Sequence, residues 1–332
     1  MSLDLSKTVY GVAAITPSGQ HITLSSFVRT LMYEEQQNEL AMRVQMDIDN
    51  RKVNGTWLHS QVPIGSWVYL YSHTTRGVEE VFRGRVLVFE PHEDPTLQFS
   101  LTAYDPLIHL QNSKDDRFYP DGTSAKVILT DIFKAWGIPI GQIDVPDIKL
   151  SKQVFRSQTV ADMVNTVLDQ VKKRGGGKFY VRYSQGKVSV LKPGQNTSVY
   201  RLHSYGTVSR ASDQWTAEQL VTRVKIVGHE DKEGRAPVVA TVDGKTEFGV
   251  FQDIILESSY DTPAAAKQAA QDIINEKGQP QKVRQIVAVD IPFLRRGDKV
   301  NIQAGTLDGD YIVSWIQHDA TTRTMTMGVE DP

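Results

Sequence analysis

The feature that most constrains this chain is a pattern of β-strands that occurs twice, once near each end. Leu40–Asp49 carries an apolar residue at every second position, and this period of two predicts a strand with one buried face. In the first copy, Pro63–Leu70, Phe82–Val88 and Leu97–Ala103 follow. The second copy consists of Val283–Ile291, Leu294–Ile302, Gly309–Ile316 and Thr324–Val329. Gly65 aligns with Gly297, Val68 with Val300 and Leu70 with Ile302.

Composition limits what such a chain can do. Its 332 residues exceed one ordinary core, so we expect two or three domains. The 37 basic and 39 acidic side chains give a net charge of −2 and are interspersed, which argues against nucleic-acid recognition. The absence of cysteine excludes disulfides, thiolate nucleophiles and cysteine-ligated zinc. With no long apolar run and no charged leader, we expect neither membrane insertion nor export through a signal peptide.

Three helices are predicted between and within the β-regions. Ser124 and Thr159 are expected N-caps of two helices that end before Gly137 and Gly175, and a hairpin over 178–191 follows them. Thr262 is the expected cap of a third helix, with Pro263 at its first position and Gly278 as its stop. Two segments are less regular. We interpret 34–39 as a solvated loop rather than a short polar helix, and 229–245 as a polar, mobile excursion.

These elements predict a β-rich α+β fold with two similar β-barrel-like modules. The first module is expected over residues 1–110 and a small α+β insert of two helices and a hairpin over 111–198. The second module is expected over 199–230 and 280–332. An excursion with one helix, over 231–279, interrupts it.

Candidate chemistry is sparse in the sequence. The closest approaches to a metal-ligand cluster are His92-Glu93-Asp94 and His229-Glu230-Asp231, but adjacent residues point in different directions, so we interpret both as loops. The three glycines 175–177 follow a helix, whereas a phosphate loop precedes one. Arg296-Gly297-Asp298 matches an integrin-binding tripeptide, although a turn before a strand is the better interpretation. No Gly-x-Ser-x-Gly elbow is present. Acidic residues beside Gly or Pro, namely Asp105, Asp121, Asp298 and Asp310, could pair in a glycosidase but suit turns better.

The order of these parts resembles the baseplate hub proteins of contractile phage tails and of related defective prophages and tail-like particles. The resemblance covers nearly the whole chain. It rests on three stretches: Tyr33–Val44, Thr159–Val164 leading to Gly177–Val181, and Gly297–Val300 followed by Gly309–Val313. It implies a non-enzymatic homotrimer, without cofactor or metal, that joins the tail tube to the central spike within a virion or tail-like particle, alongside other baseplate proteins. Such particles assemble in the bacterial cytoplasm.

The expected mechanism follows from the doubling. Three chains with two modules each would form a six-part ring that faces a sixfold tube on one side and a threefold spike on the other. We expect Arg43, Gln45, Asp47, Arg284 and Asp290 on the polar strand faces that line the ring or meet water. Two alternatives stay open. One is a tail-associated cell-wall glycan hydrolase or wall-binding protein with its site in the insert; the other is a carbohydrate-binding β-protein that presents Trp57, Trp67 and Trp315 on one platform.

Overall fold

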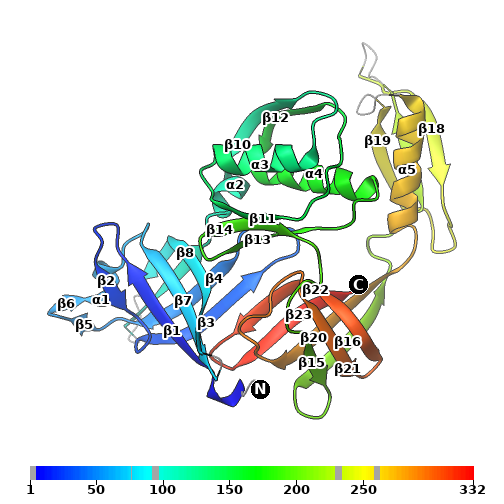
Figure 1. Cartoon of the computed structure of the whole chain (residues 1–332). Coiled ribbons are helices and arrows are strands. Elements are labelled where there is room, and N and C mark those ends of the chain that lie inside the picture. Colours follow the sequence, from blue (N-terminus) through cyan, green and yellow to red (C-terminus); the bar gives the residue numbers. More distant parts are fainter. Residues whose placement is uncertain (1–4, 76, 92–96, 229–233, 258–261) are drawn as a thin grey trace. The chain divides into compact units, whose positions relative to one another are not determined.

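The computed structural model describes residues 5–75, 77–91, 97–228, 234–257 and 262–332. The chain divides into two compact units. The larger unit consists of Met1–Ala211 and Gln285–Pro332, and the smaller consists of Ser212–Arg284. Figure 1 shows the elements of each unit, coloured along the sequence.

The first module is a curled antiparallel sheet with the strand order β3-β4-β9-β8-β7-β1-β2. Its strands are β1 (Val9–Ile15), β2 (His21–Thr23), β3 (Val28–Glu35), β4 (Arg43–Asp49), β7 (Trp67–Thr74), β8 (Gly77–Pro91) and β9 (Gln98–Tyr104). The sheet curls enough for Tyr10 on β1 and Tyr33 on β3 to meet through their hydroxyls at 2.8 Å. The alternation predicted for β4 is confirmed, because Val44, Met46 and Ile48 are buried in the core of this module. A short helix α1 (Leu58–Gln61) and the β5 (Lys52–Val53)–β6 (Thr56–Trp57) pair extend from it.

The second module repeats this arrangement near the carboxyl end. Its strands are β15 (Tyr200–His203), β16 (Val208–Thr216), β20 (Gln281–Val289), β21 (Lys299–Ala304), β22 (Leu307–Asp319) and β23 (Thr324–Glu330). The order is β16-β20-β23-β22-β21, with β15 added in parallel to β21. The path β3-β4-β9-β8-β7 of the first module therefore corresponds, strand for strand, to β16-β20-β23-β22-β21.

The turn that precedes the last strand of each path, β7 or β21, is the same in both modules. Gly65 and Gly297 have φ angles of 86° and 88°, a conformation that favours glycine. The amide of Gly65 donates to Val86 O at 2.8 Å, and the amide of Gly297 donates to Val313 O at 2.8 Å. The amides of Val86 and Val313 donate in return to the carbonyls of Ser66 and Asp298, both at 2.9 Å.

A β-bulge confirms the correspondence. In the first module the pairing of β8 with β9 shifts between Val86 and Val88, and in the second the pairing of β22 with β23 shifts between Val313 and Trp315. Because bulges re-aim a strand at a defined point, an identical bulge beside an identical turn marks two copies of one design. The two similar β-barrel-like modules predicted from the sequence are present.

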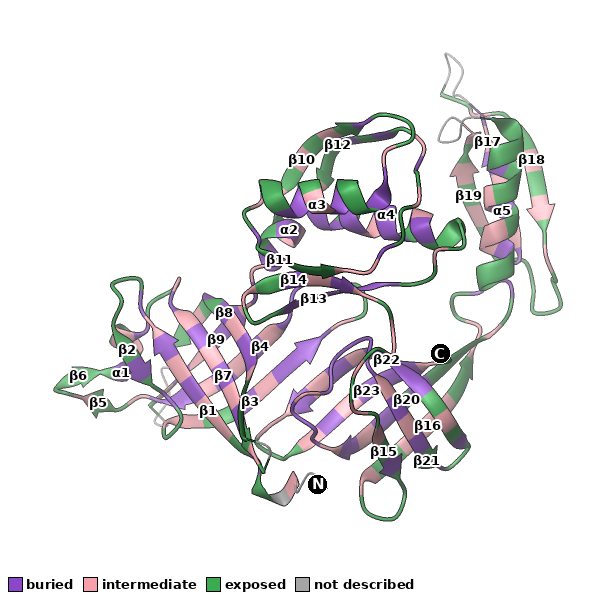
Figure 2. Cartoon of the chain, viewed as in Figure 1, coloured by how far each residue is buried: buried purple, intermediate pink, exposed green. Residues whose placement is uncertain are grey.

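The two modules join edge to edge in one large sheet. Beyond its bulge, β22 leaves β21 and pairs with β3 of the first module, with Ile316 opposite Glu35 and His318 opposite Tyr33. The sheet therefore runs without a break from one module to the other, and Figure 2 marks the buried residues along its strands in purple.

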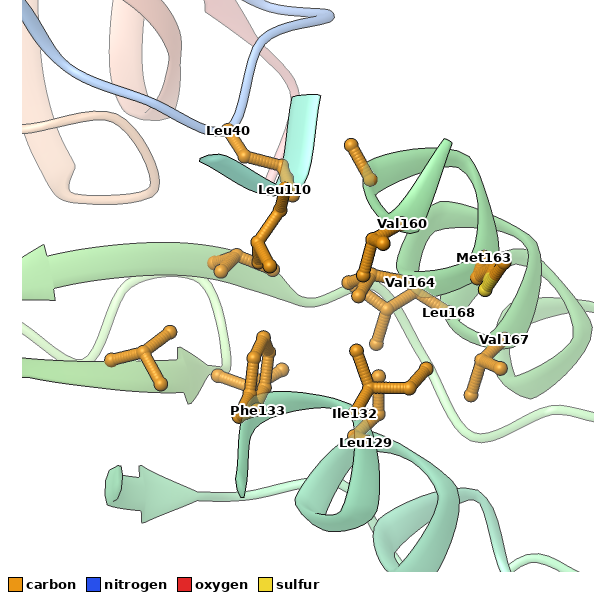
Figure 3. Packing of buried hydrophobic residues seen from close by; sticks show 14 of the residues in the cluster. Leu40, Leu110, Leu129, Ile132, Phe133, Val160, Met163, Val164, Val167 and Leu168 are labelled. Carbon is orange, nitrogen blue, oxygen red and sulfur yellow. The ribbon is translucent and has the colours of Figure 1, made fainter. Parts of the chain in front are cut away.

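The α+β insert has a core of its own between the two modules. Its elements are α2 (Ile108–Asn112), β10 (Lys114–Tyr119), α3 (Ala125–Ala135), β11 (Ile140–Ile143), β12 (Gln153–Thr159), α4 (Val160–Lys173), β13 (Tyr180–Ser184) and β14 (Lys187–Leu191). Figure 3 shows α3 residues such as Leu129, Ile132 and Phe133 facing Val164 and Leu168 of α4. These residues recur at helical spacing, so each helix buries one apolar stripe.

The predicted caps of these helices are largely confirmed. Thr159 Oγ1 accepts a hydrogen bond from the Asp162 amide at 3.1 Å, and α4 ends before Gly175, whose φ is 79°. Ser124 occupies the N-cap of α3, but its side chain makes no capping bond. Trp136 forms the C-cap of α3 ahead of Gly137.

The smaller unit is a three-stranded sheet covered by one helix. The order β18 (Val238–Asp243), β17 (Arg223–Val227), β19 (Gln252–Leu256) places β17 at the centre, and α5 (Pro263–Lys277) packs Ala266, Ala270 and Ile274 against it. Thr262 caps α5 by accepting from the Ala265 amide at 3.1 Å, as predicted.

Three interpretations of the sequence need correction, and a fourth remains a prediction. Glu34 and Glu35 lie neither in a loop nor in a polar helix, because they end strand β3 and are buried; only 36–39 form a turn. The strand expected from Leu40 begins at Arg43, since Leu40 and Ala41 pack into the core of the insert. The excursion over 229–245 contains a regular strand, β18, while its residues 229–233 lie outside the described residues. The four domain boundaries stay a prediction.

Candidate assembly surface

A buried ion pair lies where the second module meets the first. Arg295, in the turn before β21, donates through Nε and Nη2 to the two carboxylate oxygens of Glu35 at 2.7 and 2.8 Å. The Arg296 amide adds a third bond to Glu35 at 3.0 Å. Burial raises the pKa of the Glu35 carboxyl, but the Arg295 guanidinium outweighs this effect and holds the pKa at about 2. Glu35 therefore stays ionised, and the fork geometry fixes the register of the two modules.

Arg296 and Asp298 extend this contact to the other parts of the larger unit. Arg296 donates to three carbonyls of the turn after β3: Gln36, Gln37 at 3.2 Å and Glu39 at 2.7 Å. Arg182 of β13 donates to Asp298 at 2.7 Å, which attaches the insert. We call Glu35, Arg182, Arg295, Arg296 and Asp298 the seam. The tripeptide 296–298 is thus a buried turn, which agrees with the interpretation as a turn rather than an adhesion motif.

A second polar cluster closes the same junction. His318 of β22 stacks on Tyr33 with ring centroids 4.2 Å apart, and its Nδ1 lies 2.6 Å from Asp290 Oδ1. The Tyr10 hydroxyl donates to the other Asp290 oxygen. Burial and the neighbouring Asp290 carboxylate both raise the pKa of Tyr10, so the phenol keeps its proton.

The residues predicted to face a ring or water divide into two sets. Arg43, Gln45 and Asp47 share the outward face of β4 and are half-buried. Arg43 pairs with Glu34, and Asp47 accepts from the hydroxyls of Thr30 and Ser100. The structure does not bring the other two to this face.

Both residues of the other set are buried. Asp290 follows the last residue of β20 and lies in the cluster around His318. Arg284 belongs to the smaller unit, where its Nε is 3.5 Å from Asp213 Oδ1.

Among the described residues, the carboxyl-terminal end of β8 pairs with a strand on one side only. The amino-terminal half of β8 pairs with β7 as far as Arg85, while residues 88–91 pair only with β9. In the second module, the corresponding end of β22 is the stretch that pairs with β3. Leu87 and Val88 are exposed here, and Pro91 lies at the end of the strand, where it limits uncontrolled pairing.

No reactive site emerges from the described residues. They contain no group of three His, Asp or Glu residues placed to hold a metal ion. The two acidic histidine tripeptides, 92–94 and 229–231, both lie outside the described residues. Four surface hollows have linings with at most one carboxylate, Asp116. Asp105 is buried and accepts from the amides of Met42 and Leu107, so it does not face a cleft.

Within the described residues no helix has the length and apolarity needed to cross a membrane. The tryptophans of the carbohydrate hypothesis lie on three different strands, with Trp57 on β6, Trp67 on β7 and Trp315 on β22. Trp315 packs over Gly328, where an added Cβ would lie 2.1 Å from the indole nitrogen.

Sequence reasoning missed the seam. Its signal is the Tyr33-Glu34-Glu35 run at one end of a strand pattern and the Arg295-Arg296 pair before the aligned glycine. The signal that could have revealed the seam is the presence of charged residues in two strand patterns that are otherwise apolar.

Comparison with known proteins identifies a family and several solved structures that this chain resembles. The model of the YQBQ-like family matches residues 32–330. No curated protein matches the chain. Among solved structures, the 43 kDa tail protein of prophage MuSo2 from Shewanella oneidensis has 14% identity and a TM-score of 0.68, over 97% of this chain and 98% of that one.

Two further structures share the fold. The tail protein of Neisseria meningitidis MC58 has 12% identity and a TM-score of 0.69, over 97% of both chains. The Escherichia coli c3393 protein, a component of the type VI secretion system, has 9% identity and a TM-score of 0.57, over 92% of this chain and 74% of that one. The sequence resemblance to phage-tail baseplate proteins is thereby confirmed at the level of the fold, and the chain belongs to the YQBQ-like family.

Proposed function

We propose that this protein is a structural tail component, a baseplate hub subunit that assembles into a ring between the tail tube and the central spike. The observation that carries the proposal is the repeat: two modules with the same strand order, turn and bulge, already joined edge to edge in one chain. The fold shared with prophage tail proteins supports a tail role. The c3393 protein is described as similar to the T4 tail proteins gp27 and gp5, which supports a place near the spike.

The internal junction suggests how the ring would close. Inside one chain, the end of β22 pairs with β3. The equivalents of these segments are the end of β8 and strand β16. Repeating the junction between chains would therefore pair the open end of β8 with β16 of a neighbouring copy. Three copies would give six such junctions, three within chains and three between them, and close the ring.

The ring would adapt two symmetries. Six similar modules present a nearly sixfold face to a tube, while the insert and the smaller unit occur only three times and leave a threefold face for the spike. Arg43, Gln45 and Asp47 are the proposed polar face of the ring, since they share one side of β4. Cofactors have no part in this function.

Cysteine cross-linking tests the closure directly, because the chain contains no cysteine. Glu90→Cys on β8 corresponds to Gln317, which lies opposite Glu34 in the internal junction. Combined in turn with a cysteine at each position 208–214 of β16, it should yield, on oxidation, a covalent trimer of about 112 kDa, three times the 37.2 kDa chain. The internal control, Glu34→Cys with Gln317→Cys, should cross-link within one chain and leave the mass unchanged.

Mass photometry and negative-stain imaging of the unmodified protein complete the test. The proposal predicts ring particles of the trimer mass. A protein that stays monomeric at all concentrations, and that yields no covalent trimer for any cysteine pair, would argue against the ring. Lysis of purified peptidoglycan by the same preparation would support the hydrolase alternative.

A further inference from the structure

A hollow lined by aromatic rings lies between the first module and the insert. Its volume is about 310 Å³. Trp67, Arg85 and Tyr104 line it from β7, β8 and β9, and Trp136, Pro139 and Tyr183 line it from the insert. We call these six residues the aromatic pocket. A hollow of this size, lined mainly by aromatic and aliphatic side chains, is typical of a binding pocket rather than of a packing defect.

The charge that lines the aromatic pocket is positive and comes from Arg85. The Arg85 guanidinium lies over the Trp67 ring, 4.4 Å from its centroid, and donates through Nη1 to Gly65 O at 2.9 Å. Among the described residues, no carboxylate pairs with Arg85, and none lines the pocket. The hydroxyls of Tyr104 and Tyr183 likewise have no hydrogen-bond partner in the described part of the chain. A ligand with a carboxylate beside an apolar ring would satisfy these groups.

The pocket continues into a stripe of stacked side chains. Trp67, Tyr69 and Tyr71 occupy alternate positions on the outward face of β7, with successive ring centroids 6.4 Å apart. Arg83 covers Tyr69 at 5.2 Å, and its charge is already neutralised by Glu80. Arg85, which no carboxylate of the described residues neutralises, is thus at the pocket end, and the stripe offers an extended apolar track of about 13 Å leading to it.

The second module shows that the fold does not need these rings. Through the shared turn and bulge, Trp67, Tyr69 and Tyr71 correspond to Lys299, Asn301 and Gln303, all polar. Arg85 corresponds to Ile312, and Tyr104 to Glu330. Because the second module forms the same backbone with polar residues, the fold does not require the aromatic and cationic residues of the first module. These residues therefore reflect what the surface of the first module binds. Large apolar rings gathered on a surface mark binding sites.

We infer that the aromatic pocket and its stripe bind an extended, acidic, proline-containing peptide segment of a partner protein. Proline-rich segments are stiff in the extended polyproline conformation and dock on aromatic grooves at low entropic cost. Arg85, which has no carboxylate partner in the part of the chain that the structure describes, selects an acidic residue next to the ring in the pocket. A sugar fits less well, because the lining has no carboxylate or amide side chain, the groups that accept from two sugar hydroxyls at once. The inference does not depend on ring formation.

Two synthetic peptides test the inference on the full chain. Acetyl-(Pro-Pro-Glu)4-amide should bind saturably with a Kd below about 1 mM, measured by calorimetry and by the change in tryptophan fluorescence. Acetyl-(Pro-Pro-Lys)4-amide should bind at least about tenfold more weakly. Arg85→Gln should abolish this difference, and Trp67→Lys, which installs the residue of the second module, should abolish binding. Asn301→Ala, at the position equivalent to Tyr69, is the matched control and should change neither affinity.

Equal affinity for the two peptides, or no saturable binding of the acidic one, would overturn the inference. Binding of chitotetraose that is lost in Trp67→Lys, in place of peptide binding, would assign the pocket to sugars. Peptide binding by the monomer that disappears in the assembled particle would assign it to a second copy of the chain.

Discussion

The two β-modules share a backbone arrangement and differ in the side chains that this backbone carries. At the same turn, the first module has Pro63-Ile64-Gly65-Ser66 and the second has Arg295-Arg296-Gly297-Asp298. Ile64 is exposed, whereas Arg295, Arg296 and Asp298 are buried in the seam. The glycine and the two cross-strand bonds define the turn in both copies. The other three side chains of the turn decide whether it is an open surface or a junction, so a repeat can keep its backbone and change its partners.

The largest difference should come from removing Arg295. Arg295→Met leaves the buried Glu35 carboxylate without its guanidinium partner and with the Arg296 amide as its remaining donor, and we expect the free energy of unfolding to fall by about 3–5 kcal/mol. Urea unfolding followed by circular dichroism measures it. Pro63→Ala, at the equivalent position of the first module, should cost less than about 1 kcal/mol. Equal losses in the two variants would contradict the distinction between seam and surface.

The pH dependence of stability should show two buried carboxyls with opposite effects. Arg295 holds the pKa of Glu35 at about 2, below its unfolded value, so this contribution is complete above about pH 4.5 and is lost as the pH falls toward 2. Burial raises the pKa of Asp105 to about 7. The folded chain therefore holds the Asp105 proton more tightly than the unfolded chain, and stability falls as the pH rises from about 4 to 7.

The two windows predict greatest stability near pH 4–5 from these groups, with a loss of a few kcal/mol by neutral pH. Urea midpoints measured from pH 3 to 8 test this. Asp105→Asn should flatten the descent between pH 4 and 7. Asp331→Asn, at the exposed equivalent position in the second module, should leave the descent intact. A flat profile for the unmodified protein would refute the assignment to Asp105.

The paired glycines allow a sharper test of the same frame. Both have positive φ, so alanine should cost about 1–2 kcal/mol at either position. At Gly297 an added Cβ would also lie 2.9 Å from the Tyr180 ring, while at Gly65 the nearest group is Pro17 at 3.9 Å. Gly297→Ala should therefore be less stable than Gly65→Ala by about a further 1–3 kcal/mol. The reverse order in thermal unfolding would show that the insert does not close on this turn.

The smallest effect should come from the aromatic stripe. Tyr71→Gln gives the first module the residue that the second carries at this position, and we expect the stability to change by less than about 1 kcal/mol. The reciprocal Gln303→Tyr is its control. A loss above about 2 kcal/mol would mean that the rings hold the fold and are not reserved for a partner.

The repeat was predictable because its determinants are local. Alternation in β4, Gly65 and Gly297 at turns, and Thr159 and Thr262 at helix starts each act through neighbours in the sequence. The seam was not, since Glu35 and Arg295 are 260 residues apart and each alone is typical of a solvated segment. The burial of Asp290, which was expected on a polar strand face, was not predictable for a related reason. Its position continues the alternation of β20, but the strand ends at Val289 and the carboxylate turns toward His318. The aromatic pocket needs two parts of the chain, so no single stretch indicates it.

The pairing of β22 with β3 inside one polypeptide has a consequence for dilution. A contact between separate molecules weakens as their concentration falls, but a contact between tethered segments keeps a fixed local concentration. In the proposed ring, the three junctions within chains would thus not depend on protein concentration, unlike the three junctions between chains. In the proposed ring, any concentration threshold for assembly would then reflect the pairing of the end of β8 with a neighbouring chain.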